Sequence, residues 1–156
     1  MSIQKMPPPI SRGDAYSKKG DLNRAIADYD KAINLEPKDA LAYRDRGDTF
    51  FEKGDLDPAI ADYDKAISLD QKKEWANYFY RGLAYHRKGN LDRAIEDYDE
   101  AISLDPERAP VYVVLGKAFY DKGDLNRAIA NYDKAMSLNP KDALAYRGRG
   151  DTFYSK

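Results

Sequence analysis

The sequence has no cysteine and a single histidine, His86, among its 156 residues. Without cysteine the chain has no disulfide, no thiolate nucleophile and no cysteine-ligated metal site. One histidine cannot build a His-based metal site, and a base without a neighbouring nucleophile is weak evidence for catalysis. Glycine-rich phosphate loops, nucleophile elbows and clusters of metal-ligand residues are also missing from the sequence. We therefore predict a non-enzyme without a metal or cofactor.

The chain also lacks an excess of charge of either sign and any long hydrophobic run. It carries 26 Lys and Arg residues against 27 Asp and Glu residues, a net charge of -1. Nucleic acids and anionic membranes select a basic surplus or a basic face, so we expect neither as a partner. The longest apolar run lies around "VYVVLG", far short of a membrane span, and the N-terminal "MSIQKMPPPI" has no secretory signal pattern. A cytoplasmic location is the default expectation.

The glycines reveal an internal repeat. Nine of the ten recur with steps of 34 or 35 residues, in one series at positions 13, 47, 82, 116 and 150 and in another at 20, 54, 89 and 123. A fixed period of this length indicates repeated supersecondary units. Residues 1–9 are predicted as an irregular leader, and residues 10–156 as a single domain. The repeat units are residues 6–39, 40–74, 75–108 and 109–142, followed by a half unit at 143–156.

Each unit has the pattern of two helices. In the second unit the first helix presents one face at about 100° per residue, formed by Tyr43, Arg46, Gly47 and Phe50, and Gly54 can end that helix. The next helix carries an apolar stripe at Ala59, Ile60, Tyr63, Ala66 and Ile67. We predict the N-caps of the second helices at Asn23, Asp57, Asp92 and Asn126. Each unit is therefore predicted to be a helical hairpin with Gly or Ala at its closest approach, and the fold class is all-α.

These residues resemble the tetratricopeptide repeat, because the period, the second-helix text "GDL..AI..YDKAI.L.P" and the Gly and Tyr or Phe positions of the first helix all match it. The resemblance covers nearly the whole chain from about residue 10. It implies a right-handed α-α superhelix, or solenoid, of four helical hairpins plus one additional C-terminal helix. One extra residue near "QKKEW" departs from the family pattern, and so does arginine in place of the frequent aliphatic residue before the first glycine, at Arg12, Arg46, Arg81 and Arg149. An arginine stem that snorkels along the edge of the core can accommodate that second departure.

Function is expected on first-helix residues that are not needed for packing. Helical geometry directs these side chains away from the packing stripe. The resemblance implies that the first-helix faces line a concave groove, which binds a peptide or protein segment. The predicted groove residues are Arg44, Asp48, Phe51, Phe79, Leu83, His86, Arg87, Val113, Lys117 and Tyr120.

The apolar groove residues Phe79, Leu83 and Val113 allow two interpretations. If exposed, they would receive apolar side chains of a ligand, since burying each is worth roughly 1.5–3 kcal/mol. Alternatively, they fill contacts between neighbouring helices of the array. His86 has two interpretations as well, because it either tunes binding near its titration range or is an ordinary surface histidine.

The C-terminal half unit suggests a second class of function. Residues 123–156 match residues 20–53 at 27 of 34 positions, yet they stop one residue short of the glycine that ends the earlier helix. We expect Tyr146 and Phe153 either to be covered within the chain by a capping helix or to mediate self-association into a homo-oligomer. A targeting domain of a longer protein is a third alternative. The leading prediction is a protein-interaction scaffold whose partner is a protein or peptide ligand, with the self-assembling array as the alternative.

Overall fold

The computed structural model describes residues 20–156, which contain helices and no strand. The all-α prediction is therefore confirmed for this part of the chain. The predicted leader, residues 1–9, and the first helix of the first repeat lie outside the described residues. The helices are α2 (Leu22–Leu35), α3 (Ala40–Lys53), α4 (Leu56–Leu69), α5 (Trp75–Arg87), α6 (Leu91–Leu104), α7 (Ala109–Asp121), α8 (Leu125–Leu138) and α9 (Ala143–Ser155).

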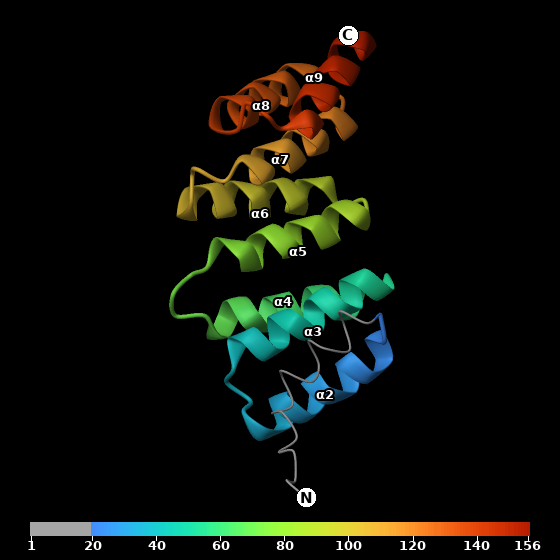
Figure 1. Ribbon diagram of the computed structural model, residues 1–156, viewed down its shortest axis with the longest axis vertical. Helices are drawn as coiled ribbons and strands as arrows, with labels where there is room; N and C mark the ends of the chain where they lie inside the picture. Colours follow the sequence, from blue (N-terminus) through green and yellow to red (C-terminus); the bar gives the residue numbers. More distant parts are fainter. Residues whose placement is uncertain (1–19) are drawn as a thin grey trace, which may run out of the picture. The chain divides into compact units, whose positions relative to one another are not determined.

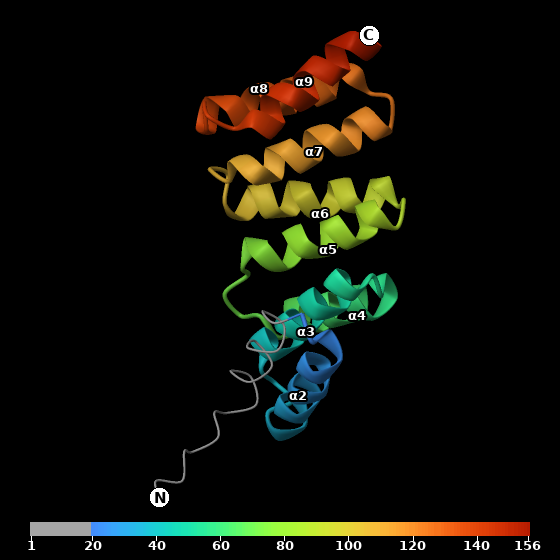
Figure 2. The same cartoon turned by 45° about the vertical axis from the view of Figure 1, so that its right-hand side comes forward.

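The chain divides into two compact units, Met1–Lys72 and Lys73–Lys156. The division falls at the joint that the extra residue lengthens, where Lys73 has a positive φ of 51°. In the first unit α3 packs against both α2 and α4. In the second, α6 lies between α5 and α7, and α8 lies beside both α7 and α9 (Figures 1 and 2). Each second helix of the second unit thus contacts the first helix before it and the first helix after it.

The helix ends follow from local chemistry, and they correct the predicted N-caps. The caps are Asp21, Asp55, Asn90 and Asp124, two residues before Asn23, Asp57, Asp92 and Asn126. The prediction was wrong because the leucine between each pair is already helical. At Asp21, Asn90 and Asp124 a carboxylate or amide oxygen accepts the N–H of the third helical residue, as Asp21 does from Arg24 at 3.3 Å, whereas Asp55 makes no side-chain capping bond. The predicted end of α3 is confirmed, since Gly54 is its C-cap with φ 90°.

Buried tyrosines hold the two helices of each hairpin together. Tyr63, Tyr98 and Tyr132 are almost fully buried, with 0%, 0% and 2% of their surface exposed. Each ring lies against the glycine of the preceding first helix. A Cβ at Gly47 or Gly82 would come within 3.0 Å or 2.6 Å of the Tyr63 or Tyr98 ring. These glycines are therefore required by close approach of the helices, as the repeat predicted.

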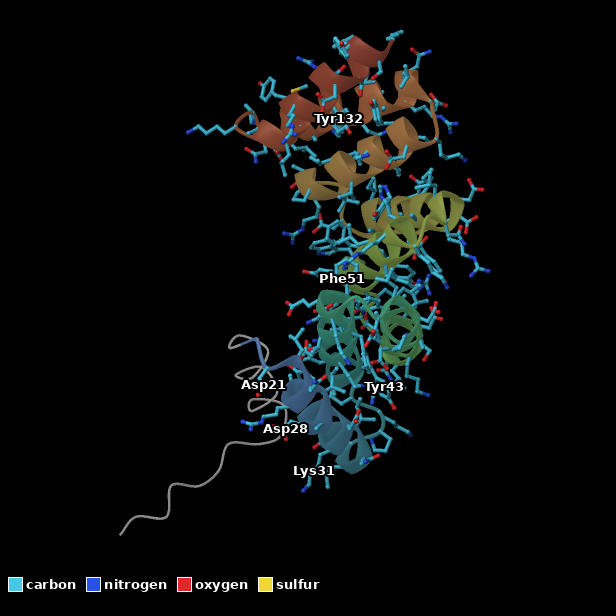
Figure 3. The ribbon with its side chains drawn as sticks, turned by 90° about the vertical axis from the view of Figure 1, so that its right-hand side faces the viewer. Asp21, Asp28, Lys31, Tyr43, Phe51 and Tyr132 are labelled. Carbon is cyan, nitrogen blue, oxygen red and sulfur yellow. The ribbon has the colours of Figure 1, made fainter. Side chains whose placement is uncertain are left out.

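The tenth glycine, Gly148, has a role that the repeat did not reveal. A Cβ at this position of α9 would lie 2.5 Å from the Cζ atom of Tyr132 on α8. Together with the fully buried Ala145 and Thr152, Gly148 lets α9 pack closely on the helix before it. Figure 3 labels Tyr132 in this part of the second unit. The equivalent residue of the second repeat is Asp45. The two repeats therefore differ at the residue that allows this close contact in α9.

An arginine joins consecutive helices in the first unit. Arg46 on α3 donates from Nε and Nη2 to both carboxylate oxygens of Asp62 on α4, at 2.8 and 2.6 Å. Its Nη1 donates to Asp30 on α2 at 2.6 Å, and its guanidinium lies 5.7 and 6.0 Å from the ring centroids of Tyr43 and Phe50. The hydrogen bond to Asp62, although opposed by burial, raises the pKa of Arg46 above its ordinary value. The arginine therefore does more than snorkel, because its head group neutralises a carboxylate that is only 5% exposed.

The positions equivalent to Arg46 and Asp62 are occupied in two ways in the second unit. Arg81 on α5 donates to both oxygens of Asp97 on α6, at 2.9 and 2.6 Å. In the fourth repeat the arginine position is Leu115, 3% exposed on α7, and the aspartate position is Asn131 on α8. Asn131 donates from Nδ2 to the carbonyl of Arg127 at 2.9 Å. Arginine and aspartate thus change together between repeats.

Candidate functional site

In the first unit the predicted groove residues Arg44, Asp48 and Phe51 are half-buried on α3. Figure 3 labels Phe51 on that helix. Asp48 accepts a hydrogen bond from the Tyr63 hydroxyl at 2.7 Å. Burial raises the pKa of Asp48 to about 6, although the bond from Tyr63 lowers it. This carboxyl group therefore titrates at a higher pH than an ordinary aspartate does.

In the second unit the apolar groove residues serve partly as packing residues. Phe79, Leu83, Val113 and Tyr120 are half-buried and pack against the core cluster that includes Tyr98. The ring centroid of Phe79 lies 6.3 Å from that of Tyr98. Both interpretations of these side chains thus have a physical basis, because each spends part of its surface on neighbouring helices and leaves part exposed.

A polar network links α5 to α7 on the predicted groove face. His86 Nε2 lies 2.8 Å from Asp121 Oδ2, and Lys117 donates to the other oxygen of the same carboxylate. The second ring nitrogen of His86 lies 3.4 Å from the Tyr98 hydroxyl. Burial opposes ionisation of Asp121, but the hydrogen bonds from Lys117 and His86 hold its pKa below the ordinary value. His86 is therefore fixed in place between two helices.

A further hydrogen bond links α7 to α9. The hydroxyls of Tyr120 and Ser155 are 2.9 Å apart. Both this pair and the pair of His86 with Asp121 are separated by 35 residues. The sequence reasoning did not pair these residues. A search for polar side chains about one repeat apart on successive first helices is the signal that could have found them.

Arg87 is exposed at the end of α5. It lies one residue beyond His86, in the last turn of the helix. The ten predicted groove residues therefore fall into two sets, three on α3 in the first unit and seven on α5 and α7 in the second.

Two surface depressions of the described residues lie away from the predicted groove residues. One is lined by the turn around Gly89 and by Lys122, and the equivalent depression one repeat later is lined by the turn around Gly123 and by Lys156. Neither contains a predicted groove residue. Because they recur with the repeat, they are a feature of the scaffold rather than a distinct site.

The structure also locates the two residues predicted for self-association. Tyr146 and Phe153 on α9 are 49% and 56% exposed. Residues 20–156 therefore cover only about half of each side chain, although α9 itself packs on α7 and α8. Within the same residues no group of three or more His, Cys, Asp or Glu side chains could hold a metal ion. None of the described helices combines the length and the apolar character needed to span a bilayer.

Comparison with known proteins identifies the repeat. The sequence matches the profile of the TPR repeat in four overlapping segments, residues 13–51, 47–89, 82–123 and 116–156. Comparison with the curated proteins finds no match. A crystal structure of MamA is 28% identical with a TM-score of 0.85, covering 92% of this chain and 83% of that one. The "41-end" form of MamA from Desulfovibrio magneticus RS-1 is 26% identical with a TM-score of 0.80, covering 87% and 76%.

A third structure supports the fold alone because its identity is low. YrrB, a TPR protein with an unusual peptide-binding site, is 21% identical with a TM-score of 0.79, covering 99% of this chain and 79% of that one. The structural neighbours and the four matched segments confirm the predicted class, a solenoid of helical hairpins. On this evidence the chain belongs to the tetratricopeptide repeat family.

Proposed function

We propose that the chain binds a protein or peptide segment through the first-helix face of its second compact unit, formed by α5, α7 and α9. Tetratricopeptide repeats are non-catalytic protein-interaction scaffolds. The specific proposal is that Phe79, Leu83 and Val113 receive apolar side chains of the ligand, and that Lys117 contributes a polar contact at the edge.

One observation carries this proposal. The hydrogen bonds of His86 with Asp121 and of Tyr120 with Ser155 tie α5, α7 and α9 together at successive points of one face. A face that is cross-linked in this way is pre-organised, so little conformational entropy is lost when a ligand binds. Apolar side chains that are only half-buried can then bury their remaining surface against the ligand.

The test begins with a selection of peptides from a display library on the immobilised full chain. Dissociation constants of the selected peptides are then measured for the native chain and for two groove variants, Phe79→Ala/Leu83→Ala and Lys117→Glu. We expect the double variant to weaken binding by about tenfold to a hundredfold, because two apolar contacts are lost. Lys117→Glu should weaken it by a smaller factor, because its side chain is 55% exposed.

The matched control is Leu35→Ala, which removes an apolar side chain that is 66% exposed on α2 of the other unit. Its binding should equal that of the native chain. Circular dichroism melting of each variant checks the fold, since Phe79 and Leu83 also pack against the core. Native affinity in both groove variants would refute the proposal, and so would a library that yields no binder.

A further inference from the structure

We propose that the exposed face of α9 formed by Tyr146, Arg149 and Phe153 is a docking surface for an amphipathic helix. That helix carries an aspartate that becomes buried against Arg149, as Asp62 is buried against Arg46. The proposal is separate from the peptide-binding face, because these residues lie on the side of α9 that corresponds to the contact between two helices of one hairpin. Three observations lead to it.

The first observation is that α9 reproduces the contact face of α3. Tyr43, Arg46 and Phe50 of α3 are equivalent to Tyr146, Arg149 and Phe153 of α9. In both helices the arginine guanidinium lies about 6 Å from both ring centroids: 5.7 and 6.0 Å in α3, 5.9 and 6.0 Å in α9. The N-caps agree as well, since Asp142 accepts the N–H groups of Leu144 and Ala145 as Asp39 does those of Leu41 and Ala42. The two faces therefore have the same local construction.

The second observation is the position of the arginine fork. Arg149 donates from Nη1 to Asp133 on α8 at 2.6 Å, which reproduces the bond from Arg46 Nη1 to Asp30 on α2. This bond fixes the guanidinium, as the equivalent bond does in α3. In α3 the remaining Nε and Nη2 hold both oxygens of Asp62 on the following helix. Among residues 20–156 no carboxylate meets Nε and Nη2 of Arg149. Nε and Nη2 of Arg149 are thus positioned to donate to both oxygens of one carboxylate.

The third observation is the exposure of the two rings. Tyr146 and Phe153 are 49% and 56% exposed, whereas Tyr112 and Phe119, their equivalents on α7, are 9% and 6% exposed under the cover of α8. The surface thus combines two aromatic rings with a cation between them. Its complement is a helix with a small, apolar contact face and one aspartate, as α4 presents with Ala59, Asp62, Tyr63 and Ala66.

The surface fits a partner helix that carries such an aspartate better than it fits a helix of a second copy of this chain. Asp62 and Asp97 already hold Arg46 and Arg81. Asp28 on α2 is 5% exposed, and the fourth repeat has Asn131 at this position. At the position equivalent to Asp62, no second helix within residues 20–156 therefore offers an accessible aspartate. Charge complementarity favours a partner helix with the pattern Ala-x-x-Asp-Tyr-x-x-Ala.

The probe for this surface is a labelled peptide of residues 54–69, GDLDPAIADYDKAISL, which contains α4. It is titrated against the full chain by fluorescence anisotropy up to about 1 mM, because a helix of this length is marginal in water and ordering it weakens binding. A matched peptide carries Asp62→Asn. Chain variants are Arg149→Leu and Phe153→Ala, of which the latter removes an exposed ring without disturbing the core.

We expect the native peptide to bind the native chain and to lose about tenfold or more in affinity on Arg149→Leu or on Asp62→Asn in the peptide. Phe153→Ala should also weaken binding. The combination of the Arg149→Leu chain with the Asp62→Asn peptide reproduces the pair Leu115 and Asn131, so it should bind more tightly than either mismatched combination.

Equal affinity in all four combinations, or no binding at about 1 mM, would overturn the proposal. Light scattering across a concentration series tests whether a second copy of this chain occupies the face instead. A dimer that Arg149→Leu abolishes would assign this face to a second copy and would likewise overturn the proposal of a partner helix. Failure here leaves the peptide-binding face untouched, because Phe79 and Leu83 are unchanged in every variant.

Discussion

The second and fourth repeats differ at two equivalent positions, one on each helix of the hairpin, where one repeat has an ion pair and the other has uncharged side chains. The second repeat has the ion pair of Arg46 and Asp62 between α3 and α4, and the fourth has Leu115 on α7 and Asn131 on α8. The helices nevertheless approach each other through the same glycine and tyrosine contact in both repeats. The difference teaches that the repeat accepts more than one combination of side chains at these two positions.

The physical reason lies in the burial of the carboxylate. Asp62 is 5% exposed, so its charge must be compensated within the protein. Arg46 supplies that compensation through two hydrogen bonds. An amide at the same position needs no cation, and a leucine then fills the space of the arginine stem with apolar surface. A change of one partner alone is costly, whereas a change of both is tolerated.

The largest effect is expected from Arg46→Leu, which leaves Asp62 without its cation. The free energy of unfolding should fall by about 3 kcal/mol, because an uncompensated charge stays buried between α3 and α4. Urea denaturation of the native chain and the variant measures the difference. A loss below about 1 kcal/mol would show that water or another cation already serves Asp62.

An intermediate effect is expected at Asp48, which stands where the third and fourth repeats have Leu83 and Lys117. Burial raises the pKa of Asp48 from 3.8 to about 6. Its contribution to stability is therefore fully present below pH 3.8 and is lost as the pH rises through about 6. Asp48→Asn mimics the protonated form, so its stability advantage over the native chain should be about 2 kcal/mol larger at pH 7 than at pH 3.5, after discounting for partial exposure.

Denaturant melts at both pH values measure this gap. Glu52→Gln is the matched control, since it removes an exposed carboxylate one turn away on the same helix. It should show a much smaller gap. A pH-independent difference for Asp48→Asn would mean that the carboxyl group stays ionised in the folded chain.

The smallest effect is expected from the double change Arg46→Leu/Asp62→Asn, which transfers the pair of the fourth repeat into the second. Its unfolding free energy should lie within about 1 kcal/mol of the native value, because no charge is left unpaired. Denaturation alongside the two single variants gives the coupling energy between the positions. If the double variant loses as much as the sum of the single variants, the two positions do not act as a pair.

Much of the fold followed from the spacing of a few residues. The glycine series located the hairpins, and Gly54 was predicted as the end of α3. The N-caps were placed two residues too late, because Asn and Asp occur both at the cap and in the first turn, and either could be chosen from sequence. The helical position of Asp62 could not show that its carboxylate is buried, since the arginine that pairs with it comes from another helix.

The candidate site shows the same limit. Helical geometry was sufficient to select Phe79, Leu83, Val113 and Lys117 as first-helix residues outside the packing stripe. It could not show that Phe79, Leu83 and Val113 pack partly against the core, or that His86 is held by Asp121. The contact of His86 with Asp121 joins first helices one repeat apart, and the ring of Phe79 lies near Tyr98 on the next helix, so these contacts depend on how closely different helices approach.

The sequence by itself determined the hairpin, its period and the glycine positions where its two helices approach, because each of these depends on residues within one or two helical turns or at a fixed repeat distance. Only the tertiary structure decided which carboxylates are buried, how Gly148 lets α9 approach Tyr132, and that Nε and Nη2 of Arg149 meet no carboxylate of residues 20–156 beside two exposed rings. Burial and pairing are properties of facing helices, and the distance between two faces is set by all the side chains packed between them.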